Sequence, residues 1–392
     1  MMFSIFICFL RLGCLSFGGP MAHIALFREE FVVKRAWLSA EAFQHLLAMC
    51  QLLPGPASSQ LGFTIGLQRG GISGAIAAFL GFTLPSFILM IVLAQAQALV
   101  SEQPLFHTLG HWLKLFAVCI VLDAVVSLFR QFCREPQHRL IALFTALLLV
   151  FMPSNALQLV LLALAGVVGY GWSAIHAAAA PPEPLHSPAS TNGTMRIRRW
   201  PLILFLLLFV GSLLDSGAGY LSLFALHYQA GSLVFGGGHV VLPLLQQGVA
   251  DSLTPDQFLN GYAAAQIVPG PMFTLASYLG AMLVPSAPWT GGTVATLVIF
   301  LPGFLLVLAI LPVWQQLQTQ PRLRAAISAI NASVVGLLAA TLYHPLLTSA
   351  IGQASDLLWP LLAWLVWRRY RLPIWVLVSL FLAAALIDNA LL

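Results

Sequence analysis

Long apolar stretches, rather than positions that alternate between polar and apolar, dominate the pattern along the chain. They cover residues 72–100, 140–175 with one interruption, 200–214, 290–313 and 372–392. A helix needs about 20 consecutive apolar residues to span a bilayer, whereas a transmembrane barrel shows short alternating segments. The pattern therefore predicts an all-α polytopic membrane protein.

Glycine and proline interrupt the apolar pattern at four places. The interruptions are "FGGP" from Phe17, "PGP" from Pro54, "FGGG" from Phe235 and a second "PGP" from Pro269. In the first "PGP", Pro54 disfavours helix in the residue before it, Gly55 permits a sharp reversal, and Pro56 suits the first turn of a new helix. We expect broken or re-entrant helices at all four places.

The two halves of the chain carry these motifs in the same order. "LPSF" at Leu84 and "LPGF" at Leu301 add a further matching pair. A linker rich in Pro, Ala and Ser separates the halves. We therefore predict an N-terminal transmembrane repeat (1–175), a cytoplasmic linker (176–199), an extra transmembrane helix (200–215) and a C-terminal transmembrane repeat (216–392).

The basic residues predict opposite orientations for the two repeats. The loop after "FGGP" contains Arg28, Lys34 and Arg35, whereas no Lys or Arg occurs between Pro201 and Gln320. Cytoplasmic loops carry an excess of Lys and Arg, so the equivalent loops should face opposite sides of the membrane. The extra helix supplies the odd crossing that this inversion requires. We expect two inverted-topology repeats, with the N-terminus in the cytoplasm and the C-terminus outside.

The composition agrees with a membrane protein and argues against several kinds of binding site. Of the 392 residues, 60% are hydrophobic and 7% are charged, against about 25% charged in soluble domains. Lys and Arg gather at predicted helix ends, which indicates membrane topology and not nucleic-acid binding. The five cysteines form no CxxC or Cys/His cluster, and no P-loop occurs, so we expect no disulfide, metal or cofactor. The apolar first ten residues lack a basic region and a cleavage site, so we expect a retained helix.

Interrupted helices in inverted repeats are the design of secondary transporters, whose substrate sites lie near the bilayer midplane. The free N–H groups of a helix that starts at such a break favour an anion. The predicted substrate-binding residues are those of the four breaks and the polar side chains beside them: Gly18, Gly19, Pro20, His23, Gln51, Gly55, Pro56, Ser58, Ser59, Gln60, Gly236, Gly237, Gly238, His239, Gln266, Gly270, Pro271 and Thr274. The alternatives are helix packing for the glycines and a structural role for the histidines.

Four charged residues lie in or beside apolar segments, where ionisable groups are expensive and usually functional. Arg11, Glu30, Lys114 and Asp123 are therefore candidates for charge compensation or proton coupling. Lys114 and Asp123 lie nine residues apart, on poorly matched helix faces, so we do not expect them to pair.

Together these motifs resemble the chromate ion transporter family in its long, two-domain form. The matching segments are "FGGPMAHIALFREE" (17–30), Trp37, "QLLPGPASSQ" (51–60), "FGGGHVVLP" (235–243) and "AAAQIVPGPMF" (263–273). The resemblance implies export of chromate, with sulfate as a chemical analogue. The chain departs from the family pattern at Ala57, where a polar residue is usual, and at Gly248, where an acidic residue is usual.

The favoured hypothesis is a secondary active transporter that exports chromate across the bacterial inner membrane and confers chromate resistance. The alternatives are a carrier of sulfate or another small oxyanion, a channel, and a membrane-embedded enzyme that uses Ser58 with His45. The enzyme is the weakest, because a Pro-Gly-Pro break separates those two residues. The expected partners are an inorganic oxyanion and membrane lipid, and a homodimer is the default assembly.

Overall fold

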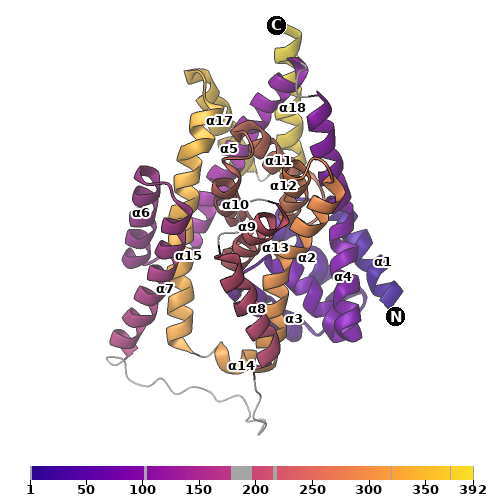
Figure 1. The fold of residues 1–392 in the computed structure, drawn as a ribbon, viewed down its shortest axis with the longest axis vertical. Coiled ribbons are helices and arrows are strands. Elements are labelled where there is room, and N and C mark those ends of the chain that lie inside the picture. Colours follow the sequence, from indigo (N-terminus) through magenta and orange to yellow (C-terminus); the bar gives the residue numbers. More distant parts are fainter. Residues whose placement is uncertain are drawn as a thin grey trace.

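The computed structural model describes residues 2–100, 104–177, 197–214, 219–318, 320–370 and 372–391. Every regular element among these residues is a helix (Figure 1). Five helical stretches are long and apolar enough to cross a membrane: Ala57–Gln97, Thr108–Phe132, Asn155–Trp172, Pro288–Leu317 and Pro321–Ala350. The chain is an all-α polytopic membrane protein, which confirms the prediction from its apolar pattern.

The first half begins with short helices on either side of its two breaks. Its elements are α1 (Met2–Leu15), α2 (Gly19–Arg28), η1 (Glu29–Lys34), α3 (Ala40–Leu52), α4 (Ala57–Val100), α5 (Pro104–Phe132), α6 (Pro136–Phe151) and α7 (Asn155–Ala177). Ser39 caps α3 by accepting a hydrogen bond from the amide of Ala42. Helix α4 consists of two helical segments, because Gly70 and Gly71 have non-helical backbone angles.

The second half has shorter segments around its breaks. Its elements are α8 (Arg199–Ser212), α9 (Tyr220–Leu233), η2 (Gly238–Val240), α10 (Val241–Val249), α11 (Pro255–Ile267), η3 (Met272–Thr274), α12 (Leu275–Leu283), α13 (Pro288–Ile310), η4 (Leu311–Val313), α14 (Trp314–Leu317), α15 (Pro321–Thr341), η5 (Leu342–Leu347), α16 (Thr348–Ala350), α17 (Ala354–Tyr370) and α18 (Ile374–Leu391). Thr254 and Gln257 form a capping box at the start of α11.

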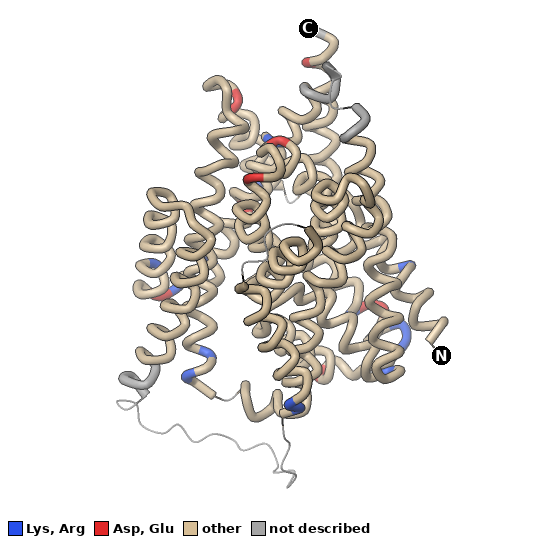
Figure 2. The backbone as a smooth tube through the Cα atoms, viewed as in Figure 1, with Lys and Arg blue, Asp and Glu red and all other residues tan. Residues whose placement is uncertain are grey.

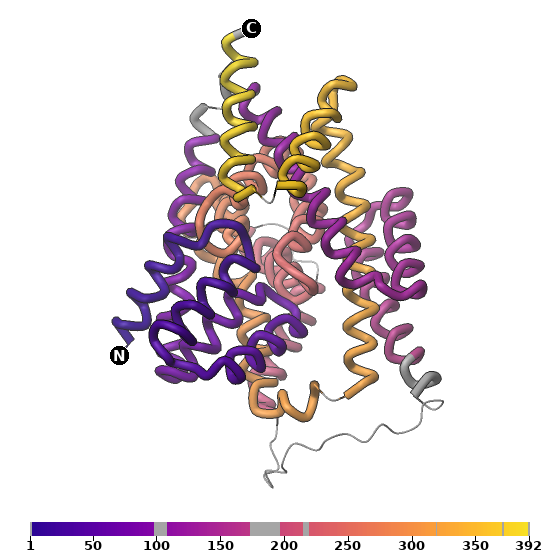
Figure 3. The backbone as a smooth tube through the Cα atoms, turned by 180° about the vertical axis from the view of Figure 1, so that it is seen from behind, coloured from indigo at the N-terminus to yellow at the C-terminus, as the bar shows by residue number. Residues whose placement is uncertain are grey.

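Each half of the chain packs two helices against the other half. Helices α6 and α7 lie along α15, and α17 and α18 lie along α5 (Figures 1 and 3). Glycines make close approaches in the first group, where Gly169 of α7 faces the backbone of Ala325 and Gly336 of α15 faces that of Ala142. A Cβ at Gly336 would lie 2.2 Å from the Ala142 carbonyl oxygen, so this packing requires glycine.

Contacts within each half enclose the breaks. Helix α1 packs on α4, and α9 packs on α13. Phe9, Phe27 and Phe82 are buried between α1, α2 and α4, and their ring centroids lie 5.0 to 5.6 Å apart in consecutive pairs. Since these are large apolar side chains in dense contact, they fix the elements on both sides of the first break.

Charge is distributed unevenly along the long axis of the molecule. Figure 2 shows Lys and Arg mainly toward the end that carries α14, and mainly acidic residues toward the end that carries the C-terminus. The division into repeats (1–175 and 216–392), the extra helix (200–215) and the inverted orientation stay predictions. Most of the predicted linker, residues 178–196, lies outside the described residues.

Candidate functional site

The two "PGP" motifs turn the chain at glycines whose backbone angles other residues rarely adopt. Gly55 has a φ of 119° and Gly270 a φ of 118°. The residues between helices are therefore extended or left-handed there, and their backbone groups are free to bond outside their own helices. This backbone geometry determines which other segments the two turns can bind through hydrogen bonds.

Hydrogen bonds from both turns reach across to the other half of the chain. The amide of Gly55 donates to the carbonyl of Val234, 2.7 Å away, immediately before "FGGG". The amide of Gly270 donates to the carbonyl of Ser16, 2.9 Å away, immediately before "FGGP". Each "PGP" turn is thus fixed to the glycine-rich break of the other half.

Contacts within each half complete the arrangement. His23 of α2 places Nδ1 3.3 Å from the Ser58 hydroxyl and Nε2 3.3 Å from the Ser16 carbonyl. In the second half, a Cβ at Gly238 would lie 3.4 Å from the Met272 side chain. The four breaks therefore form a closed ring, which we call the break ring: residues 16–19, 54–59, 234–239 and 269–274.

The tautomer of His23 follows from its partners. The Ser16 carbonyl can only accept, so Nε2 of neutral His23 carries the proton and Nδ1 accepts from the Ser58 hydroxyl. The Ser58 proton is therefore already used. The hydroxyl of Ser59 is buried without a hydrogen-bond partner among the described residues, and it is the freer donor for a ligand.

The "LPSF" and "LPGF" motifs each pack against the "PGP" turn of the other half. The Gly55 turn lies against Gly303 of α13, and the Gly270 turn lies against Ser86 of α4. Buried Gln60 joins the first pair, because its Nε2 donates to the carbonyls of Pro54 at 2.8 Å and Gly303 at 3.3 Å. Both halves thus contribute a mid-helix motif to the support of the opposite turn.

The helices that begin at the ring have no side-chain cap, a property they share with helices elsewhere such as α6 and α15. Helix α2 and the short helices η2 and η3 have no side-chain cap at their first turn, whereas Ser39 and Thr254 cap α3 and α11. Uncapped first turns leave backbone N–H groups without helical partners. The ring sequence contains no Lys, Arg, Asp or Glu. The ring therefore offers neutral hydrogen-bond donors and positive dipole ends, the chemistry that suits an anion.

Polar side chains in and beside the second half of the ring have hydrogen-bond partners nearby. His239 Nδ1 lies 3.0 Å from the Tyr262 hydroxyl, and Gln266 Nε2 lies 3.2 Å from the sulfur of Met272. The Thr274 hydroxyl donates to the carbonyl of Pro271 at 2.8 Å. These contacts hold the second "PGP" turn in place.

Several predicted site residues lie away from the ring. Gln51 and Arg11 are exposed on α3 and α1. Glu30 accepts a hydrogen bond from Arg35 Nε at 2.6 Å, and this hydrogen bond is the main cause that holds the pKa of the Glu30 carboxyl below its usual value. The structure therefore separates this group of residues from the polar groups that meet at the breaks.

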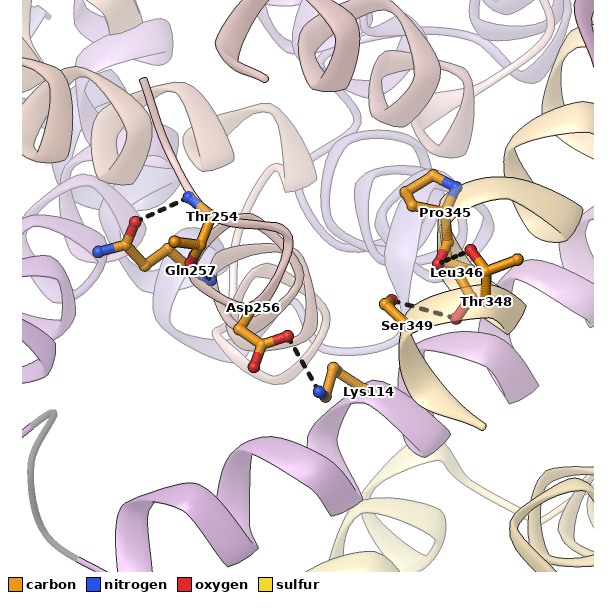
Figure 4. A network of polar contacts seen from close by, with 8 residues as sticks. All are labelled: Lys114, Thr254, Asp256, Gln257, Pro345, Leu346, Thr348 and Ser349. Carbon is orange, nitrogen blue, oxygen red and sulfur yellow. Dashed lines mark hydrogen bonds and ion pairs between the residues drawn. The ribbon is translucent and has the colours of Figure 1, made fainter. Parts of the chain in front are cut away.

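The two charged residues of α5 both pair with the second half of the chain. Lys114 contacts Asp256 at 2.9 Å, beside the turn that carries Thr348 (Figure 4). Asp123 contacts Arg368 of α17 at 3.1 Å and accepts a hydrogen bond from the indole of Trp364. Lys114 and Asp123 therefore have separate partners, and both contacts tie α5 to the other half.

A polar cavity of about 340 Å³ lies beside α10. Its lining includes Gln158, Gln246, Gln247, Thr341 and His344, from α7, α10, α15 and η5. Helix α10 starts at the ring through η2, so one wall of the cavity is continuous with the second glycine-rich break.

Comparison with known proteins assigns the chain to a family. The sequence model of the chromate transporter family matches residues 3–170 and 221–387. The chain belongs to the chromate transporter family. It is 28% identical to a chromate transport protein of Pseudomonas aeruginosa over 86% of this chain and 79% of that protein. Identity is also 28% with a chromate transport protein of Cupriavidus metallidurans, over 84% and 78% of the two chains.

A relative whose name gives no substrate matches over most of the chain as well. An uncharacterized transporter of Methanocaldococcus jannaschii is 27% identical over 97% of this chain and 93% of its own length. No solved structure matches the chain. The family assignment therefore rests on sequence, and the geometry of the ring comes from this structure alone.

Sequence reasoning found the four breaks but not the residues that join them. The predicted site did not include Val234, which belongs to the ring, or Ser86, Gly303 and Tyr262, which contact it. The "LPSF" and "LPGF" repetition was a signal for two of them. Nothing in the order of the motifs indicated that each turn bonds to the opposite half.

Proposed function

We propose that this chain is a secondary active transporter that exports chromate across the inner membrane and confers chromate resistance, with the break ring as its substrate site. Family membership supports the substrate class, since two of the relatives are named chromate transport proteins. The observation that carries the choice of site is the pair of hydrogen bonds from Gly55 to Val234 and from Gly270 to Ser16. They bring all four breaks to one place between the halves.

The chemistry of the ring suits a tetrahedral dianion that must be released again. Backbone N–H groups at uncapped helix starts and the Ser59 hydroxyl supply donors. A site without Lys or Arg binds such an anion through dipoles and hydrogen bonds alone. Transport requires binding that is strong enough for entry and weak enough for exit. A neutral site meets both conditions more readily than one with a fixed cation.

The proposed mechanism is alternating access between two arrangements of the halves. Repeats of opposite orientation can exchange conformations, so that the site opens to one side and then to the other. A dianion that leaves a cell with a negative interior gains about 4.6 kcal/mol per 100 mV. That energy sustains roughly a thousandfold gradient, so export needs no ATP.

Transport of sulfate or another small oxyanion by the same site is the second candidate. Sulfate is also a tetrahedral dianion, and the neutral donors of the ring do not distinguish it from chromate by charge. Direct competition separates the two candidates. We expect chromate to inhibit radiolabelled sulfate flux at a lower concentration than sulfate inhibits chromate flux.

The site is tested by flux of radiolabelled chromate into proteoliposomes under an imposed membrane potential. We expect the Ser58→Ala/Ser59→Ala variant to lower the initial rate at least tenfold, because one change breaks the contact with His23 and the other removes a free donor. Ser73→Ala is the matched control, since this serine is exposed and its hydroxyl donates to the Gly70 carbonyl in its own turn. Unchanged flux in the double variant rules out the ring as the substrate site.

A further inference from the structure

Two arginines from separate elements share one tryptophan at the end of the first helical segment of α4. The guanidinium carbons of Arg35 and Arg69 lie 5.5 and 5.3 Å from the centre of the Trp37 ring. Such distances are typical of cation–π contacts. Two like charges are therefore held against a single indole.

The Trp37 indole packs on a stack of two further aromatic rings. Trp37 stacks on Phe31 with ring centroids 5.0 Å apart, and Phe31 stacks on Phe9 at 4.9 Å. Phe9 and Phe31 are fully buried. The platform under the two arginines is thus rigid and continuous with the core, which is what a preformed site requires.

The backbone beside Trp37 is strained. Ala36 has a φ of 48°, the only positive φ at a non-glycine among the described residues. The amide of Trp37 donates to the carbonyl of Phe31 at 2.8 Å, which fixes the indole despite this strain. Residues held in such conformations cluster at functional sites, and here the conformation places Arg35 and Trp37 on one surface.

The two arginines differ in how their charge is balanced. Glu30 accepts from Arg35 Nε at 2.6 Å and neutralises that side chain. Among the described residues, Trp37 is the one recorded contact of the Arg69 guanidinium. The planar N–H donors of Arg69 are therefore free, and a guanidinium fork matches two oxygens of a tetrahedral oxyanion.

Membrane topology alone does not account for this geometry. The positive-inside tendency needs basic residues on one side of the membrane, but it does not require two of them on one ring. Placing like charges together costs free energy unless an anion compensates them. Glu30 compensates one of the two charges, and no carboxylate among the described residues pairs with the second.

We propose that Arg35, Trp37 and Arg69 form a second anion site, separate from the break ring, for a tetrahedral oxyanion. The ligand is either a free oxyanion such as sulfate or the phosphate of a lipid headgroup. The free-ligand form rests on the proposed function, because the bound anion is then one waiting to be transported. Helix α4 links the two sites: its first segment starts in the ring at Ala57 and ends at Arg69, which places them about 18 Å apart at the helical rise.

The test measures binding, so that it does not depend on transport. Full-length protein in nanodiscs of phosphatidylcholine alone is titrated with radiolabelled sulfate. We expect Arg69→Gln to remove a class of sites or weaken it at least tenfold. Glu30→Gln should tighten binding severalfold, because it removes the carboxylate that competes for Arg35. Arg324→Gln is the matched control, because it removes one exposed positive charge at the start of α15.

A second arm identifies the source of the anion. Phosphatidylglycerol is added to the nanodiscs, and its retention by purified protein is measured for wild type, Arg69→Gln and Arg324→Gln. A loss of retained anionic lipid in Arg69→Gln alone supports a headgroup as the ligand, and sulfate binding without lipid supports the free anion. Equal effects of Arg69→Gln and Arg324→Gln in both arms overturn the proposal. Sulfate binding at Arg69 in a protein that transports no oxyanion would leave the site standing and refute the proposed function.

Discussion

The amide of Gly55 and the carbonyl of Val234 lie 2.7 Å apart, although they belong to opposite halves of the chain. Gly270 and Ser16 repeat the relationship at 2.9 Å with the halves exchanged. Two isolated breaks would leave unpaired backbone groups in the apolar interior, which is costly. The crossed bonds satisfy those groups and at the same time join the halves at the level of the ring.

Replacement of either turn glycine should disrupt the ring. A Cβ at Gly270 would lie 2.6 Å from the Ser86 hydroxyl, and one at Gly55 would lie 2.9 Å from the Gln60 amide. The positive φ adds backbone strain of about 1–3 kcal/mol. We expect Gly55→Ala and Gly270→Ala each to lower thermal stability in detergent and to abolish chromate flux. Gly171→Ala, with open space around it, should leave both unchanged.

A compensating change separates crowding from backbone strain. In Gly270→Ala/Ser86→Gly, the clashing hydroxyl is gone but the strained φ remains. We expect part of the lost melting temperature to return, because only the steric contribution is removed. A double variant no more stable than Gly270→Ala would show that the two segments are not in contact.

Gln60 should act as a bridge between the halves rather than as a surface polar group. It is fully buried and donates to the carbonyls of Pro54 and Gly303. Gln60→Leu leaves those acceptors unpaired, at about 1–3 kcal/mol each. We expect a clear loss of thermal stability and of flux, whereas Gln51→Leu, at an exposed position nearby, should lose neither. Equal melting curves for the two variants would contradict this role.

Opposite orientation of the repeats can be measured with two exposed serines. Ser73 follows the break inside α4, and Ser286 lies in the corresponding connection between α12 and α13. In a background without the native cysteines, Ser73→Cys and Ser286→Cys are exposed to a membrane-impermeant maleimide in intact cells. We expect labelling of Cys at position 286 alone, and of position 73 only after permeabilisation. Labelling of both from the same side would refute the inversion.

Because helices of each half pack against helices of the other half, we predict that neither half folds alone. Without the second half, α6 and α7 lose α15, and α5 loses α17 and α18. We expect residues 1–190 and 191–392 expressed separately to be degraded, and the two expressed together to copurify and transport. A stable, monodisperse half would show that packing between the halves is not required for folding. The intact chain, expressed at the same level, is the reference.

The sequence predicted the helices and breaks of this fold better than the tertiary contacts between them. The length of the apolar stretches predicted the membrane helices, because bilayer thickness sets that length. Gly55 and Gly270 predicted turns, because other residues avoid their backbone angles. The crossed bonds from these glycines involve backbone carbonyls of Ser16 and Val234, which have no side-chain signature. Tertiary pairing of backbone groups is invisible in a single sequence.

The charged residues show a second limit. Ionisable groups in apolar segments are rightly expected to be special, but Lys114 and Asp123 form pairs with Asp256 and Arg368 outside the ring. The partners are distant in the chain, so spacing could exclude the pairing of Lys114 with Asp123 but could not supply the actual one. Arg69 and Trp37 are likewise distant in the chain, so spacing could not predict their contact.

The absence of Lys, Arg, Asp and Glu from the ring sequence has an electrical consequence. In the proposed alternating-access cycle, the empty ring carries no fixed charge, so the ring itself adds no charge movement to the unloaded return step. The ring then contributes to the voltage dependence only through the charge of its cargo. A divalent cargo that leaves without a coupled ion should carry two elementary charges of current per molecule transported.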